Sequence, residues 1–108
     1  MKGGMNKLLQ QAQKLQESLA KAQEELETLE VEASAGGGAV TVIANGRGDI
    51  VSIRIAREVI TPEDPEMLED LVLAGVTAAI EKSRETAQEH MAQATGGILP
   101  PGMSLPGM

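Results

Sequence analysis

Residues 31–55 read VEASAGGGAVTVIANGRGDIVSIRI, and this stretch decides the fold. Apolar and polar side chains alternate at the period of a half-buried β-strand in three segments, 31–35, 40–42 and 51–55. Two runs of turn-forming residues, 36–38 and 45–49, separate these segments. In the second run the pair Asn-Gly favours the positive φ values of a tight hairpin turn. We therefore predict a meander of three antiparallel strands.

Two isoleucines flank the second predicted turn. Ile43 and Ile50 fall on the face of the meander that should be the wetter one, if Val42 and Ile53 point to the core. Large apolar side chains on a solvated face indicate an interaction surface. We expect a partner to cover part of this face.

A long helix is predicted ahead of the sheet, over residues 5–30. Its apolar side chains repeat with heptad spacing, and the flanking positions hold mostly Gln, Glu, Ser and Lys. The a and d positions of the heptads are Met5, Leu8, Ala12, Leu15, Leu19, Ala22, Leu26 and Leu29. Such a narrow apolar seam favours packing of this helix against another helix, at least over its first half. The alternative is that the helix lies on the sheet of its own chain.

A second helix is predicted after the sheet. Asp64 suits the N-cap, Pro65 suits the first helical position, and apolar residues then recur at helical spacing. The helix should end near Thr95, before two glycines. Gly75 lies inside it, which indicates a close backbone approach to the sheet, because glycine costs about 1 kcal/mol there relative to alanine. The fold class is thus α+β, with the order α-β-β-β-α. Residues 1–97 form one domain, and residues 98–108 form a tail rich in Pro, Gly and Met, flexible or draped on a surface.

The composition limits both the core and the chemistry. The chain has 108 residues and contains no Phe, Tyr, Trp or Cys. Without aromatic side chains a short chain buries little apolar area, so we expect a second copy to complete the core. Disulfides and thiolate chemistry are excluded. We find no signal peptide and no apolar run of membrane-spanning length, which predicts a cytoplasmic protein without membrane contact.

Nothing in the sequence indicates an enzyme. The carboxylates of residues 63–70 gather at the start of the second helix, where they complement its dipole, and the metal-site alternative lacks matching ligands. The single histidine, His90, is expected to be solvated, because a lone histidine builds neither a metal site nor a triad. We therefore predict no catalytic residue, no metal, no cofactor and no small-molecule substrate.

The charge is unevenly distributed along the chain. The net charge of -7 alone argues against nucleic acid, whose backbone attracts positive charge. The acidic residues, however, concentrate in 24–32 and 58–72, and the basic ones prevail in 1–23 and 33–57. Lys7, Lys14 and Lys21 recur every seven residues along one side of the first helix.

The alternative to DNA contact is ion pairing, of Lys14 with Glu17 and of Lys21 with Glu17, Glu24 and Glu25. Lys7 has no carboxylate one turn away. Amide side chains beside these lysines suit contacts to sugar and phosphate oxygens. The candidate DNA-binding residues are Lys2, Asn6, Lys7, Gln10, Gln13, Lys14, Arg47, Lys82 and Arg84. For Lys82 and Arg84, pairing with nearby glutamates is the leading alternative. The candidate dimer-interface residues are Leu8, Leu15, Leu19 and Leu26.

Several segments resemble the YbaB/EbfC family, and the resemblance covers essentially the whole chain in the same order. The similar segments are 5–16, 45–53, 67–72 and 95–97, the last followed by a Pro-Gly tail. Two departures are the pair Ala56-Arg57, where the family often has Asp-Pro, and Thr77, where it often has Asn or Asp. The resemblance implies an α-β-β-β-α protomer and an intertwined homodimer whose helices project like tweezers.

It also implies binding to double-stranded DNA, linked to nucleoid organisation and gene expression. Weak sequence preference is expected, because no recognition helix rich in Arg and Asn is evident. A second interpretation remains open: an acidic dimeric adaptor whose coiled-coil arm binds another protein.

Overall fold

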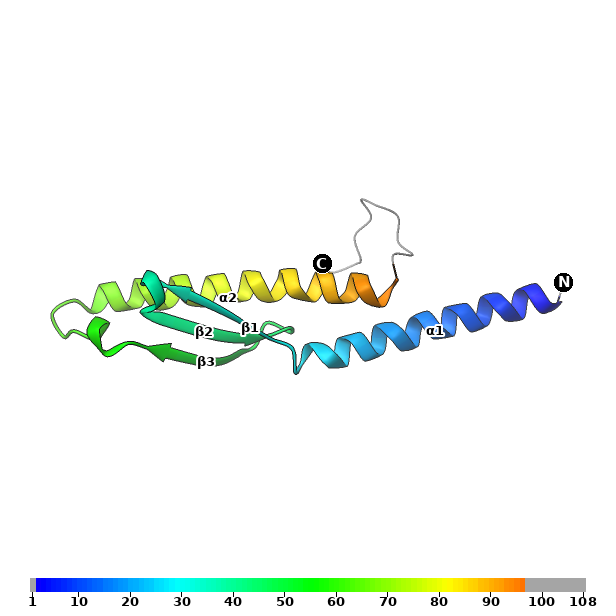
Figure 1. Ribbon diagram of the computed structural model, residues 1–108, viewed down its shortest axis with the longest axis horizontal. Helices are drawn as coiled ribbons and strands as arrows, with labels where there is room; N and C mark the ends of the chain where they lie inside the picture. Colours follow the sequence, from blue (N-terminus) through cyan, green and yellow to red (C-terminus); the bar gives the residue numbers. More distant parts are fainter. Residues whose placement is uncertain (1, 97–108) are drawn as a thin grey trace.

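The structure is a computed structural model that describes residues 2–96 (Figure 1). Its helices and strands are α1 (Lys2–Leu26), β1 (Glu30–Ala35), β2 (Val40–Asn45), β3 (Ile50–Ile55) and α2 (Pro65–Ala94). Short 3-10 turns, Gly36–Gly38 and Arg57–Val59, follow β1 and β3. The predicted α+β class and the order α-β-β-β-α are confirmed. The tail predicted over residues 98–108 lies outside the described residues.

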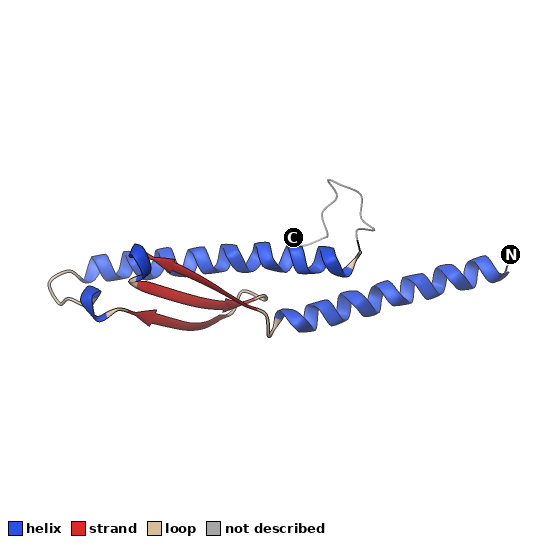
Figure 2. Cartoon of the chain, viewed as in Figure 1, coloured by secondary structure: helices blue, strands red, loops and turns tan. Residues whose placement is uncertain are grey.

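The three strands form an antiparallel sheet in the order β1-β2-β3, as the meander prediction required. Helix α2 runs along one face of this sheet and packs on β1 and β2 (Figure 2). In the register, Val42 lies opposite Ala33 on one side and opposite Ile53 on the other. The core under α2 consists of Val31, Val40, Val42, Ala44 and Ala79. A core of such small side chains leaves much of the chain's apolar surface outside it.

Gly75 allows α2 to approach the sheet closely, as predicted. A methyl group at this position would stand 3.0 Å from Cγ2 of Val42 and 3.3 Å from Cγ1 of Val40. Both valines are fully buried. The missing side chain therefore sets the distance between helix and sheet.

Strand β3 lies at the edge of the sheet and extends beyond the cover of α2. Ile53 and Ile55 stand opposite Val42 and Val40, so they belong to the face on which α2 packs. Nevertheless every residue of β3 except Ile55 is exposed, and Ile53 is 43% exposed. The apolar face of the sheet thus continues past the edge of the helix.

The expected position of Ile50 is wrong, because a β-bulge changes the register. Ser52 pairs with Ile43, but Ile50 pairs with Ala44, so Val51 is the additional residue. A bulge of this kind shifts the alternation of side chains by one position. Ile50 therefore lies opposite a residue of the face that α2 covers and does not share a face with Ile43. It is 38% exposed, and Val51 is 51% exposed.

Helix α1 packs mainly against α2. Ala22 is buried and Leu15, Leu19, Leu26 and Leu29 are half-buried, which confirms a helical partner for the second half of the seam. The first half was also expected to be paired. In the described chain it is open, since Met5 is 66% and Leu8 65% exposed. Figure 1 shows this part of α1 extending past the end of α2.

The helix ends differ in how well the sequence predicts them. Asp64 caps α2, because its Oδ1 accepts a hydrogen bond of 3.2 Å from the Met67 N–H. α2 ends at Ala94 with Thr95 as its C-cap, as predicted. α1 stops at Leu26, four residues before the predicted Glu30, because the Gly46 N–H reaches the Leu26 carbonyl at 2.8 Å. None of the described helices is both long and apolar enough to span a membrane.

Candidate nucleic-acid interface

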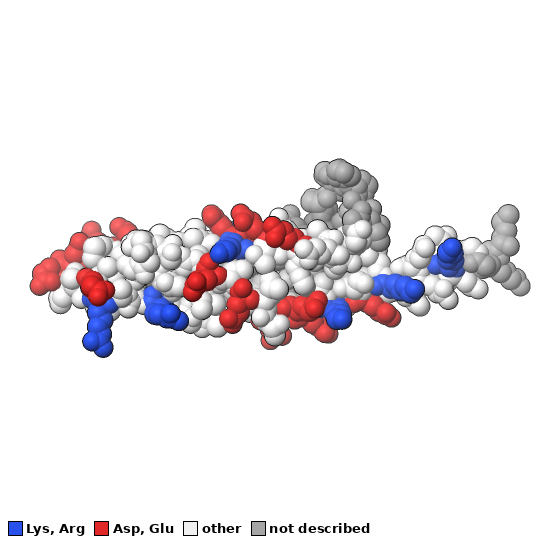
Figure 3. Space-filling view, in the orientation of Figure 1, with Lys and Arg blue, Asp and Glu red and all other residues white. Residues whose placement is uncertain are grey.

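The first candidate surface is the arm, which we define as residues 4–16 of α1. All its side chains are exposed except Leu15, which is half-buried. It contains Lys7 and Lys14, and no carboxylate precedes Glu17. In Figure 3 the outer end of α1 carries basic side chains and no acidic ones, and acidic side chains gather at the opposite end of the molecule. The arm is therefore a local region of positive charge on an acidic protein.

The polar side chains of the arm share one side of the helix. At about 100° per residue, the five candidates on the arm fall within an arc of about 120°. They are Asn6, Lys7, Gln10, Gln13 and Lys14. The centre of this arc is opposite the apolar seam, so a ligand on the polar side leaves the seam free. Successive lysines stand about 10.5 Å apart along the axis, at 1.5 Å per residue.

The ion pairs that could have neutralised these lysines are absent from the described residues. The salt bridges found there are Arg47 with Glu27 and His90 with Glu25. Lys7, Lys14 and Lys21 have no carboxylate oxygen within 4.0 Å in the part of the chain that the structure describes. For Lys14 and Lys21, an ion pair with Glu17 was the alternative to a contact with DNA. Their charges are thus open to an external anion. The backbone of Lys2 is helical, but its side chain lies outside the description.

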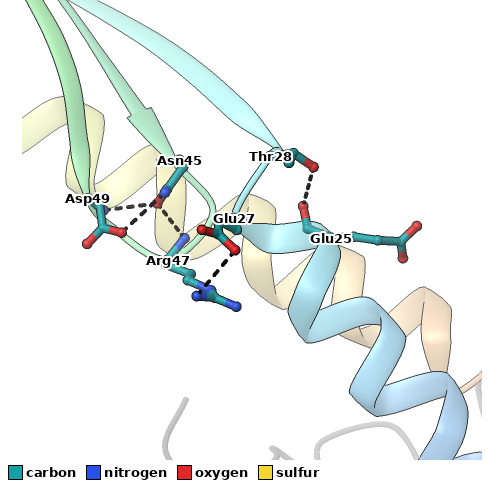
Figure 4. A network of polar contacts seen from close by, with 6 residues as sticks. All are labelled: Glu25, Glu27, Thr28, Asn45, Arg47 and Asp49. Carbon is teal, nitrogen blue, oxygen red and sulfur yellow. Dashed lines mark hydrogen bonds and ion pairs between the residues drawn. The ribbon is translucent and has the colours of Figure 1, made fainter.

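The second candidate surface is the turn between β2 and β3, which carries Arg47 (Figure 4). The Asn45 side chain holds the turn from inside. Its Oδ1 accepts hydrogen bonds from the Arg47 N–H at 2.9 Å and the Asp49 N–H at 3.1 Å. Its Nδ2 donates to Asp49 Oδ2 at 3.2 Å. The positive φ expected of Asn-Gly falls instead on Gly48, at 86°. Asn45 therefore acts through its side chain, as Asn commonly does in turns.

Both helices hold this turn in place. The Gly46 N–H donates to Leu26 O at the end of α1, and a Cβ on Gly46 would stand 2.9 Å from that oxygen. From α2, the buried Ser83 hydroxyl donates to Asn45 O at 2.7 Å. The turn is thus fixed between the two helices. Sequence analysis missed this role of Ser83, although its place four residues after Ala79 on the buried stripe of α2 was a usable signal.

A concavity of about 770 Å³ lies between this turn and α2. The residues that line it include Arg47, Arg84 and Gln88, together with small and apolar residues of the turn and of α2. No carboxylate belongs to the lining. Arg84 has no ion pair among the described residues, although glutamates flank it in sequence. The structure therefore brings the two predicted arginines together around one hollow.

Lys82, a candidate, and His90, which was not one, are both engaged within the protein. Lys82 Nζ donates a 2.8 Å hydrogen bond to Glu32 O of β1, in place of the pairing with neighbouring glutamates that we considered. The expectation that His90 is solvated is wrong. Its side chain is 23% exposed, and its Nε2 lies 3.2 Å from Glu25 Oε1 across the contact between α1 and α2. Among residues 2–96 no group of three or more His, Cys, Asp or Glu could hold a metal ion.

Comparisons with known proteins agree with this architecture. The sequence model of the YbaB/EbfC DNA-binding family matches residues 1–98. A nucleoid-associated protein of Pelotomaculum thermopropionicum is 47% identical over 103 residues, which cover 95% of this chain and 98% of the relative. One of Acetivibrio thermocellus is 51% identical over 96 residues, 89% of this chain and 85% of the relative.

Among solved structures, an uncharacterized protein from Helicobacter pylori, HP0035, superposes with a TM-score of 0.62 at 20% identity. The superposition covers 79% of this chain and 86% of that one. At this level of identity the match shows the fold alone.

Proposed function

The chain belongs to the YbaB/EbfC DNA-binding family, and from this premise we propose that it binds the phosphate backbone of double-stranded DNA as a homodimer. The observation that supports this most directly is the arm. It places two lysines and three amide side chains on one exposed side of a helix, without a carboxylate or an internal ion pair among the described residues. Lysine ammonium groups and amides are common ligands of phosphate and sugar oxygens.

The proposed binding has little sequence preference. The arm contains no arginine, and a bidentate Arg contact to guanine is the commonest specific contact in the major groove. Lysine acts as a point charge on a flexible stem, which suits phosphates of any sequence. The arm therefore positions the protein on DNA more than it reads bases.

A second copy is proposed to cover the open apolar surface of the sheet. β3 presents an unpaired strand edge, and Ile50, Val51 and Ile53 beside it are exposed. Open strand edges with apolar side chains favour pairing with another chain. The core of a single chain holds only small side chains, so the additional burial has a large effect on stability. Leu8, at the open end of the seam, is available to the same partner or to its arm.

The relatives are named nucleoid-associated proteins, and we extend this location to the present chain. A dimer carries two arms, and two separated contacts let one particle hold two stretches of DNA or two sides of one duplex. Such binding compacts or stiffens DNA and alters access to promoters. Effects on nucleoid organisation and gene expression follow from this arrangement.

The test is fluorescence anisotropy of a labelled duplex of about 30 bp, titrated with protein at several salt concentrations. Release of counterions gives a slope of about -0.9 per phosphate contact in a plot of log affinity against log salt. With two arm lysines per subunit, we expect a slope of about -2 to -4. An affinity that does not change between about 50 and 200 mM salt would favour the protein-binding adaptor.

Variants of the arm locate the contact. Lys7→Ala should weaken binding more than Lys21→Ala, because Lys21 lies among Glu17, Glu24 and Glu25 in sequence, and its field is partly cancelled. Lys7→Ala should also reduce the magnitude of the salt slope by about one for each subunit engaged. Both variants keep helix propensity nearly unchanged. Equal affinities of Lys7→Ala and the unmodified protein would exclude the outer arm as a DNA contact.

A further inference from the structure

We propose that the concavity between the β2–β3 turn and α2 binds backbone phosphate of DNA. In this proposal Arg47 and Arg84 bind the same stretch of one DNA strand. This inference rests on the proposed DNA-binding function and adds a second contact at the base of the arm. The two arginines come from a turn and from a helix that are distant in sequence, and both residues line the hollow. Nothing in the sequence pattern pairs them.

The turn holds the backbone of Arg47 in a fixed position. Its backbone N–H is held by Asn45 Oδ1, and the residues on both sides of it are bonded to α1 and within the turn. Arg84 directly follows Ser83, whose buried hydroxyl fastens the turn to α2. The relative position of the two arginine backbones is therefore fixed before a ligand arrives. Fixed donors bind an anion without the entropy loss of ordering a loop.

The donors available in the hollow favour a phosphate group. The N–H groups of Gly46, Arg47 and Gly48 already have acceptors, so the donors left for a ligand are on side chains. They are the Arg84 guanidinium, the Gln88 amide and the Arg47 guanidinium, whose partner among the described residues is Glu27 at 3.7 Å. The planar guanidinium fork matches two phosphate oxygens at once. No carboxylate lines the hollow to repel an anion or to attract a cation.

Glu27 is the internal competitor of the ligand. Its Oε2 lies 3.7 Å from Nη1 of Arg47, and the two side chains are 65% and 47% exposed. An exposed pair at that distance is weak. A phosphodiester can therefore displace the carboxylate, and removing the carboxylate should favour DNA.

The geometry favours DNA over a free anion as the source of the phosphate. The hollow is open and larger than a single phosphate ion, and it lies beside the last turn of α1, the helix that carries the arm. From Leu26 to Lys14 the helix rises about 18 Å, and to Lys7 about 29 Å, at 1.5 Å per residue. A duplex of about 30 bp is about 100 Å long, at about 3.4 Å per base pair, and so exceeds both distances.

The experiment measures DNA affinity of Arg47→Ala, Arg84→Ala and the double variant in the intact chain by anisotropy. We expect each single variant to bind about five- to tenfold more weakly, in keeping with the usual net contribution of one hydrogen bond. If both arginines hold the same stretch, the loss in the double variant is smaller than the product of the single losses. Arg57→Ala removes an equal charge from an exposed residue outside the hollow and should change affinity less than twofold.

A gain of affinity tests the same site without a risk of misfolding. Glu27→Gln should tighten binding about two- to threefold at low salt, and Glu69→Gln, which removes an equal charge from the start of α2, should have a smaller effect. The gain should vanish in an Arg47→Ala background. A gain that persists there would overturn the role of Arg47.

Other outcomes separate the failure of this site from the failure of the function. If the unmodified protein binds no duplex, the proposed function itself is wrong. If it binds and the double variant binds equally well, only the site is wrong. NMR shifts of the two guanidinium groups with inorganic phosphate, without any effect of the variants on DNA binding, would assign the hollow to a free anion. Dissociation of the dimer by the double variant would assign it to the subunit interface. Either result overturns the proposal.

Discussion

Replacing Gly75 by alanine tests the packing on which the whole protomer depends. The new methyl group would lie 3.0 Å from Val42 Cγ2 and 3.3 Å from Val40 Cγ1. Carbon atoms pack best at about 3.5–4.0 Å, so helix and sheet must separate by roughly half an ångström or the valines must leave their rotamers. Both valines are fully buried and β-branched, which leaves them little freedom to move.

Two opposing contributions set the change in the free energy of unfolding that Gly75→Ala causes. Alanine is a better helix former than glycine by about 1 kcal/mol, which favours the variant. Overpacking a core costs about 1–3 kcal/mol. We therefore expect a net loss of about 1 kcal/mol, or roughly 4–8 °C in Tm for a domain of this size. Gly75→Val, which adds two further methyl groups at the same point, should lose considerably more.

Thermal and urea unfolding followed by far-UV circular dichroism measure this loss, since the chain has no Trp or Tyr for fluorescence. All variants are compared at one protein concentration, because the proposed dimerisation would shift apparent stability. Gly4→Ala is the matched control, as a methyl group there meets no atom within 4 Å and should be neutral or stabilising. If Gly75→Ala were as stable as the parent, the close approach of α2 to the sheet would not limit stability, and our reasoning would be refuted.

Further predictions concern the open strand edge and the turn. Ile53→Lys should convert the proposed dimer to a monomer in light scattering, whereas Ser52→Lys, on the opposite face of β3, should leave it intact. Dissociation by both would point to a general effect of charge on the strand. Asn45→Ala removes the acceptor of two turn N–H groups from a residue that is 6% exposed, and should destabilise the fold by about 1–3 kcal/mol. Unchanged hydrogen-exchange protection at the Arg47 and Asp49 amides in that variant would contradict the proposed role of Asn45.

Local patterns predicted the elements well, because each element follows from neighbouring residues. Alternation with period two located the strands, and Asp64 followed by Pro65 located the start of α2 to the residue. Gly75 was also interpreted correctly, since a glycine inside an apolar helix needs a reason. These features depend on backbone sterics and side-chain period, which act over a few residues.

The prediction from sequence was less accurate where the end of an element or the position of a side chain depends on a residue distant in the chain. α1 ends at Leu26 because Gly46, from the β2–β3 turn, bonds its carbonyl, and heptad spacing carries no information about that contact. The bulge at Val51 moved Ile50 to the other face, which alternation alone could not reveal. Lys82 and His90 both found acceptors on elements remote in sequence.

The candidate sites show the same division between features that the sequence predicts and features that only the tertiary structure shows. The sequence by itself determined the arm, because a helix places Asn6, Lys7, Gln10, Gln13 and Lys14 on one side by its geometry alone. It also determined the family and the strand order of a meander. That a second copy completes the core stays a prediction. Only the tertiary structure decided that Arg47 and Arg84 share a hollow and that Ile53 lies beyond the cover of α2. Both facts depend on where α2 lies across the sheet, and that position is set by the packing of Gly75 and Ser83 against β2 and its turn, between residues distant in the chain.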